Sequence, residues 1–264
     1  MDSSGVARPN DHWSGAAKLG LILLFLLPAL AFSQASLSPT EIVRRADDLL
    51  RGDTNRGTYT MEVVTPNWRR TLELYVYSLG RDKIFIRILS PAKEAGIGTL
   101  RVKNEMWNYL PNVEKTIKIP PSMMAQSWMG SDFANDDLVK ESSIVNDYTH
   151  TIAAEEDTGD FSAYKIELIP KPDAAVVWGK ILFWVRKGDY VPLKEEYYDE
   201  KGRLIKVLEY SDIGAVSDHI IPRVWKMSSA LKDNHYTIIK VVDVEYNKPI
   251  DGNVFTLENL KKIQ

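Results

Sequence analysis

The sequence predicts a mainly β fold of the α+β class: one large antiparallel sheet that curls into an incomplete barrel, with helices covering its concave face. Twelve Tyr, seven Trp and seven Phe in 264 residues favour strands, where aromatic side chains are enriched. Apolar and polar residues alternate through most of the chain after Gly57, and turn signals such as Lys187-Gly188-Asp189 separate the alternating segments. About 11 strands exceed a comfortable flat sheet, so we expect the sheet to curl.

The first 35 residues have the order of a secretory signal peptide. Arg8 and Lys18 precede an apolar run over 19–32, and small residues follow as far as Ala35. This basic, apolar and small-residue order is typical of a cleavable signal. The run is shorter than the roughly 20 residues of a membrane-spanning helix, although an uncleaved anchor stays the alternative. We therefore expect cleavage after Ala35 and a single domain over 36–264.

A short amphipathic helix is predicted at the start of this domain. Ser38-Pro39-Thr40-Glu41 has the spacing of a capping box, with proline at the first helical position. Gly52 stands where the helix should end. Apolar residues share one face, namely Ile42, Val43, Ala46, Leu49 and Leu50, and charged residues lie largely opposite, namely Arg44, Arg45, Asp47 and Asp48. We expect the apolar face to pack on the sheet.

Strand periodicity marks most of the remaining chain. The candidate strands are 58–65, 70–78, 83–89, 99–103, 105–110, 115–119, 145–153, 161–169, 176–186, 192–198, 204–213, 219–227, 236–246 and 254–257. The alternation of apolar and polar residues predicts which side chains fill the concave face, among them Leu72, Leu74, Val76, Ile84, Ile86, Ile88, Tyr164, Ile166, Leu168, Leu204, Leu208, Ile238 and Val242. A lipid-binding barrel and a barrel filled by its own side chains both fit this pattern.

The stretch 107–139 does not resemble an ordinary strand and turn. Aromatic and methionine side chains crowd into it, and prolines interrupt it. Two interpretations stay open from the residues alone: a loop that plugs the core, and a mobile lid over a ligand cavity. Its acidic run from Asp132 to Asp137 is typical of helix capping, because the spacing lacks the pattern of a calcium loop.

Composition and motifs disfavour several other classes of protein. A formal net charge of −3 provides no basic field for nucleic acid. The absence of cysteine excludes disulfides, thiolate metal sites and a lipid-modified cysteine. His150, His219 and His235 are isolated and lack metal-ligand spacing. We expect no catalytic residues, no metal and no cofactor; a hydrolase stays an alternative only if a polar cleft brings a histidine beside a carboxylate.

Three motifs carry a resemblance to a known family. They are Ile86-Arg87 with Pro91-Ala92-Lys93-Glu94, the run EMWNYLP over 105–111, and the run SWMGSDF over 127–133. With the order of the preceding elements, the chain from about Leu37 to Leu260 resembles the outer-membrane lipoprotein-sorting protein family. The wider relatives of that family are the periplasmic lipoprotein carrier LolA and its receptor LolB.

The resemblance implies an incomplete barrel whose apolar cavity holds acyl chains in the periplasm of a Gram-negative bacterium. The classical carrier has an arginine near its early strands that ties down the lid, and the matching motifs do not identify which of Arg69, Arg70 and Arg87 corresponds to it. We expect a carrier that shields acyl chains of lipoproteins or lipids during transfer toward the outer membrane. The alternative is a periplasmic adaptor of an RND- or MMPL-type exporter without lipid cargo.

The expected partners follow from these two functions. They are lipid or lipoprotein acyl chains, an inner-membrane RND or MMPL transporter, and an outer-membrane receptor. The candidate ligand-binding residues come from the stretch 107–139, and they are Trp107, Tyr109, Met123, Met124, Trp128, Met129 and Phe133.

Overall fold

The computed structural model describes residues 37–140, 144–157, 159–174 and 176–262. The predicted signal peptide over 1–35 lies outside these residues and stays a prediction.

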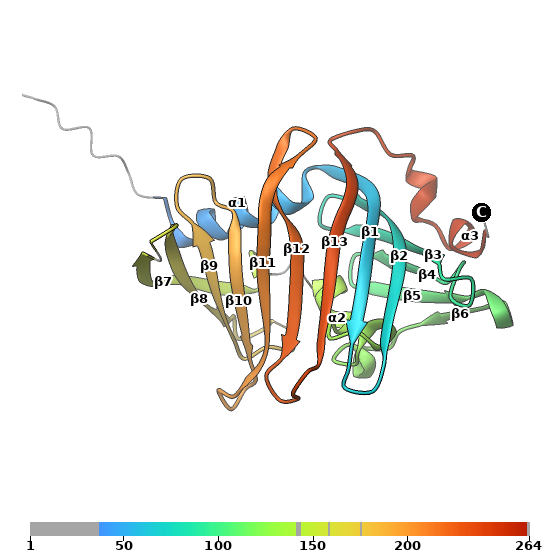
Figure 1. Ribbon diagram of the computed structural model, residues 1–264, viewed down its shortest axis with the longest axis horizontal. Coiled ribbons are helices and arrows are strands. Elements are labelled where there is room, and N and C mark those ends of the chain that lie inside the picture. The colour runs from blue at the N-terminus through green and yellow to red at the C-terminus, as the bar shows by residue number, and fades with distance from the viewer. Residues whose placement is uncertain (1–36, 141–143, 158, 175, 263–264) are drawn as a thin grey trace, which may run out of the picture. The chain divides into compact units, whose positions relative to one another are not determined.

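One antiparallel sheet of 13 strands forms the fold, in the order β6-β5-β4-β3-β2-β1-β13-β12-β11-β10-β9-β8-β7 (Figure 1). The strands are β1 (Thr54–Val64), β2 (Arg69–Leu79), β3 (Lys83–Ser90), β4 (Gly98–Val102), β5 (Glu105–Leu110), β6 (Lys115–Lys118), β7 (Tyr148–Asp157), β8 (Ser162–Pro170), β9 (Lys180–Arg186), β10 (Pro192–Tyr198), β11 (Leu204–Val216), β12 (His219–Ser229) and β13 (Tyr236–Tyr246). The two edges, β6 and β7, are not paired with each other, so the sheet is open. The mainly β, curled-sheet prediction is confirmed, with 13 strands in place of about 11.

The strand order forces one connection across the sheet. The chain builds β1 to β6 outward from the middle, and then resumes at β7 on the opposite edge. The connection between β6 and β7 therefore crosses the inner face. It contains the 3₁₀ turns η2 (Pro121–Met123) and η3 (Trp128–Gly130) and the helix α2 (Asn135–Lys140). In Figure 1 this green connection lies behind the central strands, on the same side as α1 (Pro39–Arg51).

Helix α1 begins and ends where the sequence predicts. The Ser38 Oγ accepts a hydrogen bond from the Glu41 backbone N–H at 3.2 Å, and Gly52 ends the helix with φ of +60°. Ile42, Val43 and Ala46 are buried against the sheet. The prediction that Asp47 lies on the solvent face is wrong, because its carboxylate is buried beside two arginines.

Apolar residues form a core on both faces of the sheet. Two clusters occupy the inner face, one beneath α1 against β7–β12 and one against β1–β3. A third cluster lies on the outer face of β3–β5 and consists of Phe85, Leu100, Tyr109, Phe255 and Leu260. Its cover is the C-terminal segment, which comprises η5 (Gly252–Phe255) and α3 (Leu257–Lys261).

Two sequence predictions about these elements are wrong. Residues 254–257 are not a strand, because Asp251 and Thr256 each accept a backbone N–H two or three residues ahead and start short helical turns. Ile238 and Val242 line neither cavity; Ile239 lines both, Thr237 is fully buried, and Val242 is 60% exposed. Both parities of β13 are apolar enough to fit alternation, and a bulge opposite Thr58 and Tyr59 shifts the register.

Candidate ligand-binding cavities

Two adjoining cavities lie on the inner face of the sheet. The first is bounded by α1, the connection between β6 and β7, and strands β9–β13, and its space is about 860 Å³ including the part open to solvent. The second, of about 720 Å³ measured in the same way, lies against β1–β3. Leu50, Trp225 and Ile239 line both cavities. The two spaces are therefore neighbours on one apolar surface.

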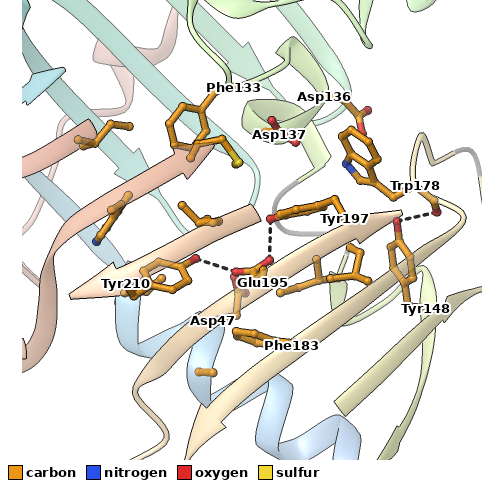
Figure 2. Close-up of a pocket in the computed structure, with 18 residues that line it drawn as sticks. Asp47, Phe133, Asp136, Asp137, Tyr148, Trp178, Phe183, Glu195, Tyr197 and Tyr210 are labelled. Carbon is orange, nitrogen blue, oxygen red and sulfur yellow. Dashed lines mark hydrogen bonds between the residues drawn. The ribbon is translucent and has the colours of Figure 1, made fainter. Parts of the chain in front are cut away.

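Aromatic side chains dominate the wall of the first cavity. They come from five strands, from the crossing connection and from the segment before β9, and they are Phe133, Tyr148, Trp178, Phe183, Tyr197, Tyr210 and Trp225. Figure 2 shows several of these rings around a central space, with Phe133 on the crossing connection opposite the strands. Such a wall provides a large apolar contact area with a few fixed polar atoms.

A buried carboxylate lies at the centre of this wall. The Glu195 side chain accepts hydrogen bonds from the hydroxyl of Tyr197 at 2.6 Å and of Tyr210 at 2.7 Å (Figure 2). Burial raises the pKa of Tyr197 well above its usual value, and the negative charge of Glu195 raises it further. The Tyr197 hydroxyl therefore stays protonated and remains a hydrogen-bond donor.

The charged residues that line the first cavity are all acidic, and no lysine or arginine is among the described lining residues. These acidic residues are Asp47, Asp136, Asp137 and Glu195. Asp47 pairs with Arg51 and with Arg81, each at 2.8 Å. Asp137 pairs with Lys206, whose ammonium lies 4.5 Å from the centre of the Trp178 ring. The lining thus disfavours a further buried anion in this cavity.

The second cavity is apolar along most of its length. Leu74, Val76, Ile84, Ile86 and Trp128 line it. Its polar lining residues are Arg51, Asn55 and Ser78. Asn55 and Ser78 are direct neighbours across the β1–β2 pair.

The crossing connection is fastened to the sheet by polar contacts. Trp128 donates its indole N–H to the Thr99 hydroxyl at 3.1 Å. The Asp132 backbone N–H donates to the Thr237 hydroxyl at 2.9 Å, and that hydroxyl donates back to the Asp132 carboxylate at 2.7 Å. The Arg70 guanidinium donates to the Met129 carbonyl. The connection therefore covers the inner face through a small number of separable bonds.

The structure divides the seven candidate ligand-binding residues into three groups. Phe133 lines the first cavity and Trp128 lines the second. Three methionines pack partly buried against the inner-face cluster, namely Met123, Met124 and Met129. Trp107 and Tyr109 pack on the outer face with the C-terminal segment, so they line neither cavity. The alternation of β5 explains this, since Met106 takes the inner face.

Sequence reasoning missed most of the first cavity. Glu195, Tyr197 and Tyr210 were within predicted strands, but no local signal joins residues on different strands. The available signal was that Glu195 and Tyr197 share one face of the segment 192–198. Glutamate is rarely buried unless it is paired, so the burial of this face is a result of tertiary structure.

The acidic run supplies contacts within the connection. The Asp137 carboxylate accepts the Ala134 backbone N–H at 2.6 Å, which is the reach-back bond of a capping box at α2. The Asn135 side chain donates to the Met123 carbonyl at 3.0 Å. Over the part of the chain that the structure describes, no group of three or more His, Asp or Glu side chains is placed to hold a metal ion.

Among the histidines, His219 lies 2.7 Å from Asp218, but neither residue lines either cavity. No described helix combines the length and the apolar character needed to cross a membrane.

An open antiparallel sheet with helices and cavities on its inner face defines a LolA-like fold, and solved structures agree. A LolA superfamily protein from Nitrosomonas europaea matches at 23% identity and a TM-score of 0.73, over 85% of this chain and 100% of its own. A DUF1329 family protein from Desulfovibrio piger matches at 22% and 0.78, over 84% and 97%. An outer membrane lipoprotein-sorting protein domain from Vibrio parahaemolyticus matches at 23% and 0.75, over 85% and 98%.

Residues 80–262 match the model of a protein family described as an uncharacterized protein, and the chain belongs to that family. The solved structures confirm the predicted resemblance to LolA-like proteins at the level of the fold. No curated protein matches the sequence significantly.

Proposed function

We propose that the protein is a periplasmic carrier that shields acyl chains of a lipoprotein or lipid during transfer toward the outer membrane. The observation that carries the proposal is the pair of adjoining apolar cavities beneath α1 and the crossing connection. Transfer of an acyl chain from water into such a space is favourable by about 25 cal/mol for each Å² buried. No covalent chemistry is needed.

The compartment in this proposal rests on the amino terminus. A signal peptide over residues 1–35 would deliver the chain to the periplasm of a Gram-negative bacterium. The solved domain from Vibrio parahaemolyticus, which is named for lipoprotein sorting, supports the same cargo class by fold. The exchange partners that we propose are an inner-membrane RND- or MMPL-type transporter and an outer-membrane receptor.

The crossing connection acts as the lid in this proposal. Of the three candidate arginines, Arg70 is the one that donates to the lid, at the Met129 carbonyl. Arg69 lies in the solvent beside Glu62, and Arg87 donates to the Leu260 carbonyl of the C-terminal segment at 3.0 Å. We infer that Arg70 ties the lid, with Trp128 and Phe133 as its cavity-facing anchors and the three methionines as adaptable packing between them.

Mass spectrometry of lipids extracted from the protein, purified from its native host, tests this function. The carrier proposal predicts an acyl-chain-bearing lipid or lipoprotein in stoichiometric amount. The adaptor alternative, in which the interior is filled by its own side chains, predicts co-purification with a transporter and no lipid. Protein that carries no lipid and binds no fatty-acyl probe would contradict the carrier.

A further inference from the structure

The second cavity contains one polar atom that the fold leaves unsatisfied. Ser78 is only 4% exposed and lies on the inner face of β2, where Leu74 and Val76 precede it on the same face. Its hydroxyl has no hydrogen-bond partner among the described residues. Buried hydroxyls are ordinarily paired, because an unmade hydrogen bond leaves the cost of desolvation uncompensated. The Ser78 hydroxyl is therefore free to donate a hydrogen bond to a ligand atom in the second cavity.

The neighbours of Ser78 form a polar end to an otherwise apolar slot. Asn55 stands directly opposite on β1, and its side-chain amide donates to the Arg51 carbonyl at 3.0 Å. From Ser78, the inner face of β2 continues through Val76 to Leu74. At about 3.3 Å per residue, Ser78 and Leu74 are roughly 13 Å apart. The second cavity thus has one hydroxyl-bearing end and an apolar wall. This arrangement matches an acyl chain, which has one oxygen-bearing end and a hydrocarbon tail.

The charged groups at the polar end of the second cavity favour a neutral ligand oxygen over a ligand carboxylate. Arg51 is the cationic lining residue of the second cavity, and its guanidinium already donates to the Asp47 carboxylate at 2.8 Å. A buried ligand carboxylate would compete with Asp47 for this cation and would leave Asp47 with Arg81 as its remaining partner, so two buried anions would lie close together. A neutral carbonyl oxygen requires only a donor, which the Ser78 hydroxyl supplies.

We propose that Ser78 donates a hydrogen bond to the ester or amide carbonyl of an acyl chain bound in the second cavity. The chain lies along Val76 and Leu74 with its carbonyl end at Asn55 and Ser78. This assignment rests on the proposed carrier function. It specifies that the cargo is an acyl ester or amide with a neutral carbonyl, and not a free fatty acid.

The test compares three ligands of equal chain length, methyl laurate, laurate and dodecane, by displacement of a fluorescent apolar probe from the full mature chain. Wild-type protein should bind methyl laurate more tightly than dodecane or laurate. Ser78→Ala should weaken methyl laurate about 3- to 10-fold, the equivalent of one neutral hydrogen bond, and leave dodecane unchanged. The same variant should raise the melting temperature of ligand-free protein, because it removes an unsatisfied buried hydroxyl.

Val76→Ala is the matched control, since it alters the same wall of the cavity without touching a polar atom. It should weaken all three ligands by a similar factor. Equal affinity of wild type and Ser78→Ala for methyl laurate would overturn the carbonyl assignment while leaving the carrier function standing. Laurate binding that is as tight as methyl laurate and equally sensitive to Ser78→Ala would identify a free carboxylate and overturn the neutral class. If none of the three ligands displaces the probe from the wild-type protein, the carrier function itself is contradicted.

Discussion

Arg70 is the residue on which the closed position of the lid depends most directly. Its guanidinium donates to the Met129 carbonyl and lies 3.6 Å from the Glu94 carboxylate. Met129 and Gly130 both have positive φ, of 49° and 74°, so the backbone turns tightly at the point of contact. The hydrogen bond from this charged donor to a turn carbonyl can break while the sheet stays folded.

Arg70→Ala should loosen the lid while leaving the sheet folded. A hydrogen bond from a charged group contributes about 1.5–3 kcal/mol, so amide hydrogen exchange over 123–133 should accelerate by roughly one order of magnitude or more. Arg69→Ala, whose side chain is 63% exposed beside Glu62, is the matched control and should leave exchange unchanged. Equal protection of the lid in both variants would show that Arg70 does not hold it.

His150 makes the attachment of α1 sensitive to pH. Its Nε2 lies 2.7 Å from the Ile144 carbonyl and its Nδ1 lies 3.0 Å from the Thr40 hydroxyl of α1. Burial lowers the pKa of His150 below 6.5 in the folded protein. Well above pH 6.5 the imidazole is neutral in both the folded and unfolded states, so its contribution is fully present. As the pH falls toward and below 6.5, the unfolded chain binds the proton more readily than the folded chain does, and stability falls.

Thermal unfolding between pH 7.5 and 5 tests this sign. Wild type should lose melting temperature on acidification by more than His150→Gln does, because the variant lacks the titrating group. A loss in His150→Gln as large as in wild type would assign the pH response to other groups.

At the scale of elements, the C-terminal segment is a structural cover on the face opposite the cavities. Leu260 is fully buried against β3–β5 together with Phe255, and Arg87 donates to the Leu260 carbonyl. The segment therefore packs on the outer face of β3, whose inner face lines the second cavity.

Leu260→Ala should destabilise the fold by about 2–5 kcal/mol, as for other buried leucines. Leu257→Ala, at a position 43% exposed, should change stability by no more than about 0.5 kcal/mol. Urea unfolding measures both values. Acyl-probe affinity of folded Leu260→Ala should match that of wild type, and a selective loss of binding would place the segment in the ligand site.

Elements were predictable where local chemistry decides them. The capping box and Gly52 placed α1, and alternation found the strands on both sides of the lid. The segment 254–257 failed because four apolar and β-branched residues fit a short strand as well as two capped turns. The inner face of β13 was not predictable because apolar residues lie on both faces of this strand and a bulge shifts its register; the buried Thr237, which donates to Asp132, is a polar residue that hydrophobicity does not select.

At the scale of the whole molecule, the site depends on a pairing that the sequence does not display. β1 pairs with β13, nearly two hundred residues away, and this places β6 and β7 at opposite edges of the sheet. The stretch 107–139 was recognisable as unusual from its composition. That Trp128 and Phe133 face the cavities while Trp107 and Tyr109 face outward follows from the topology, and so does the meeting of Glu195 with Tyr210.

Two variants of β13 test whether the inner face of the sheet holds an acyl chain. Ile239 lines both cavities, whereas Val242 on the same strand is exposed outside them. Titration of a fluorescent fatty-acyl probe should give saturable binding to wild type and to Val242→Trp. Ile239→Trp, which fills the junction of the cavities, should weaken binding at least tenfold, or about 1.4 kcal/mol. Equal binding by folded Ile239→Trp, or none by wild type, would contradict the account.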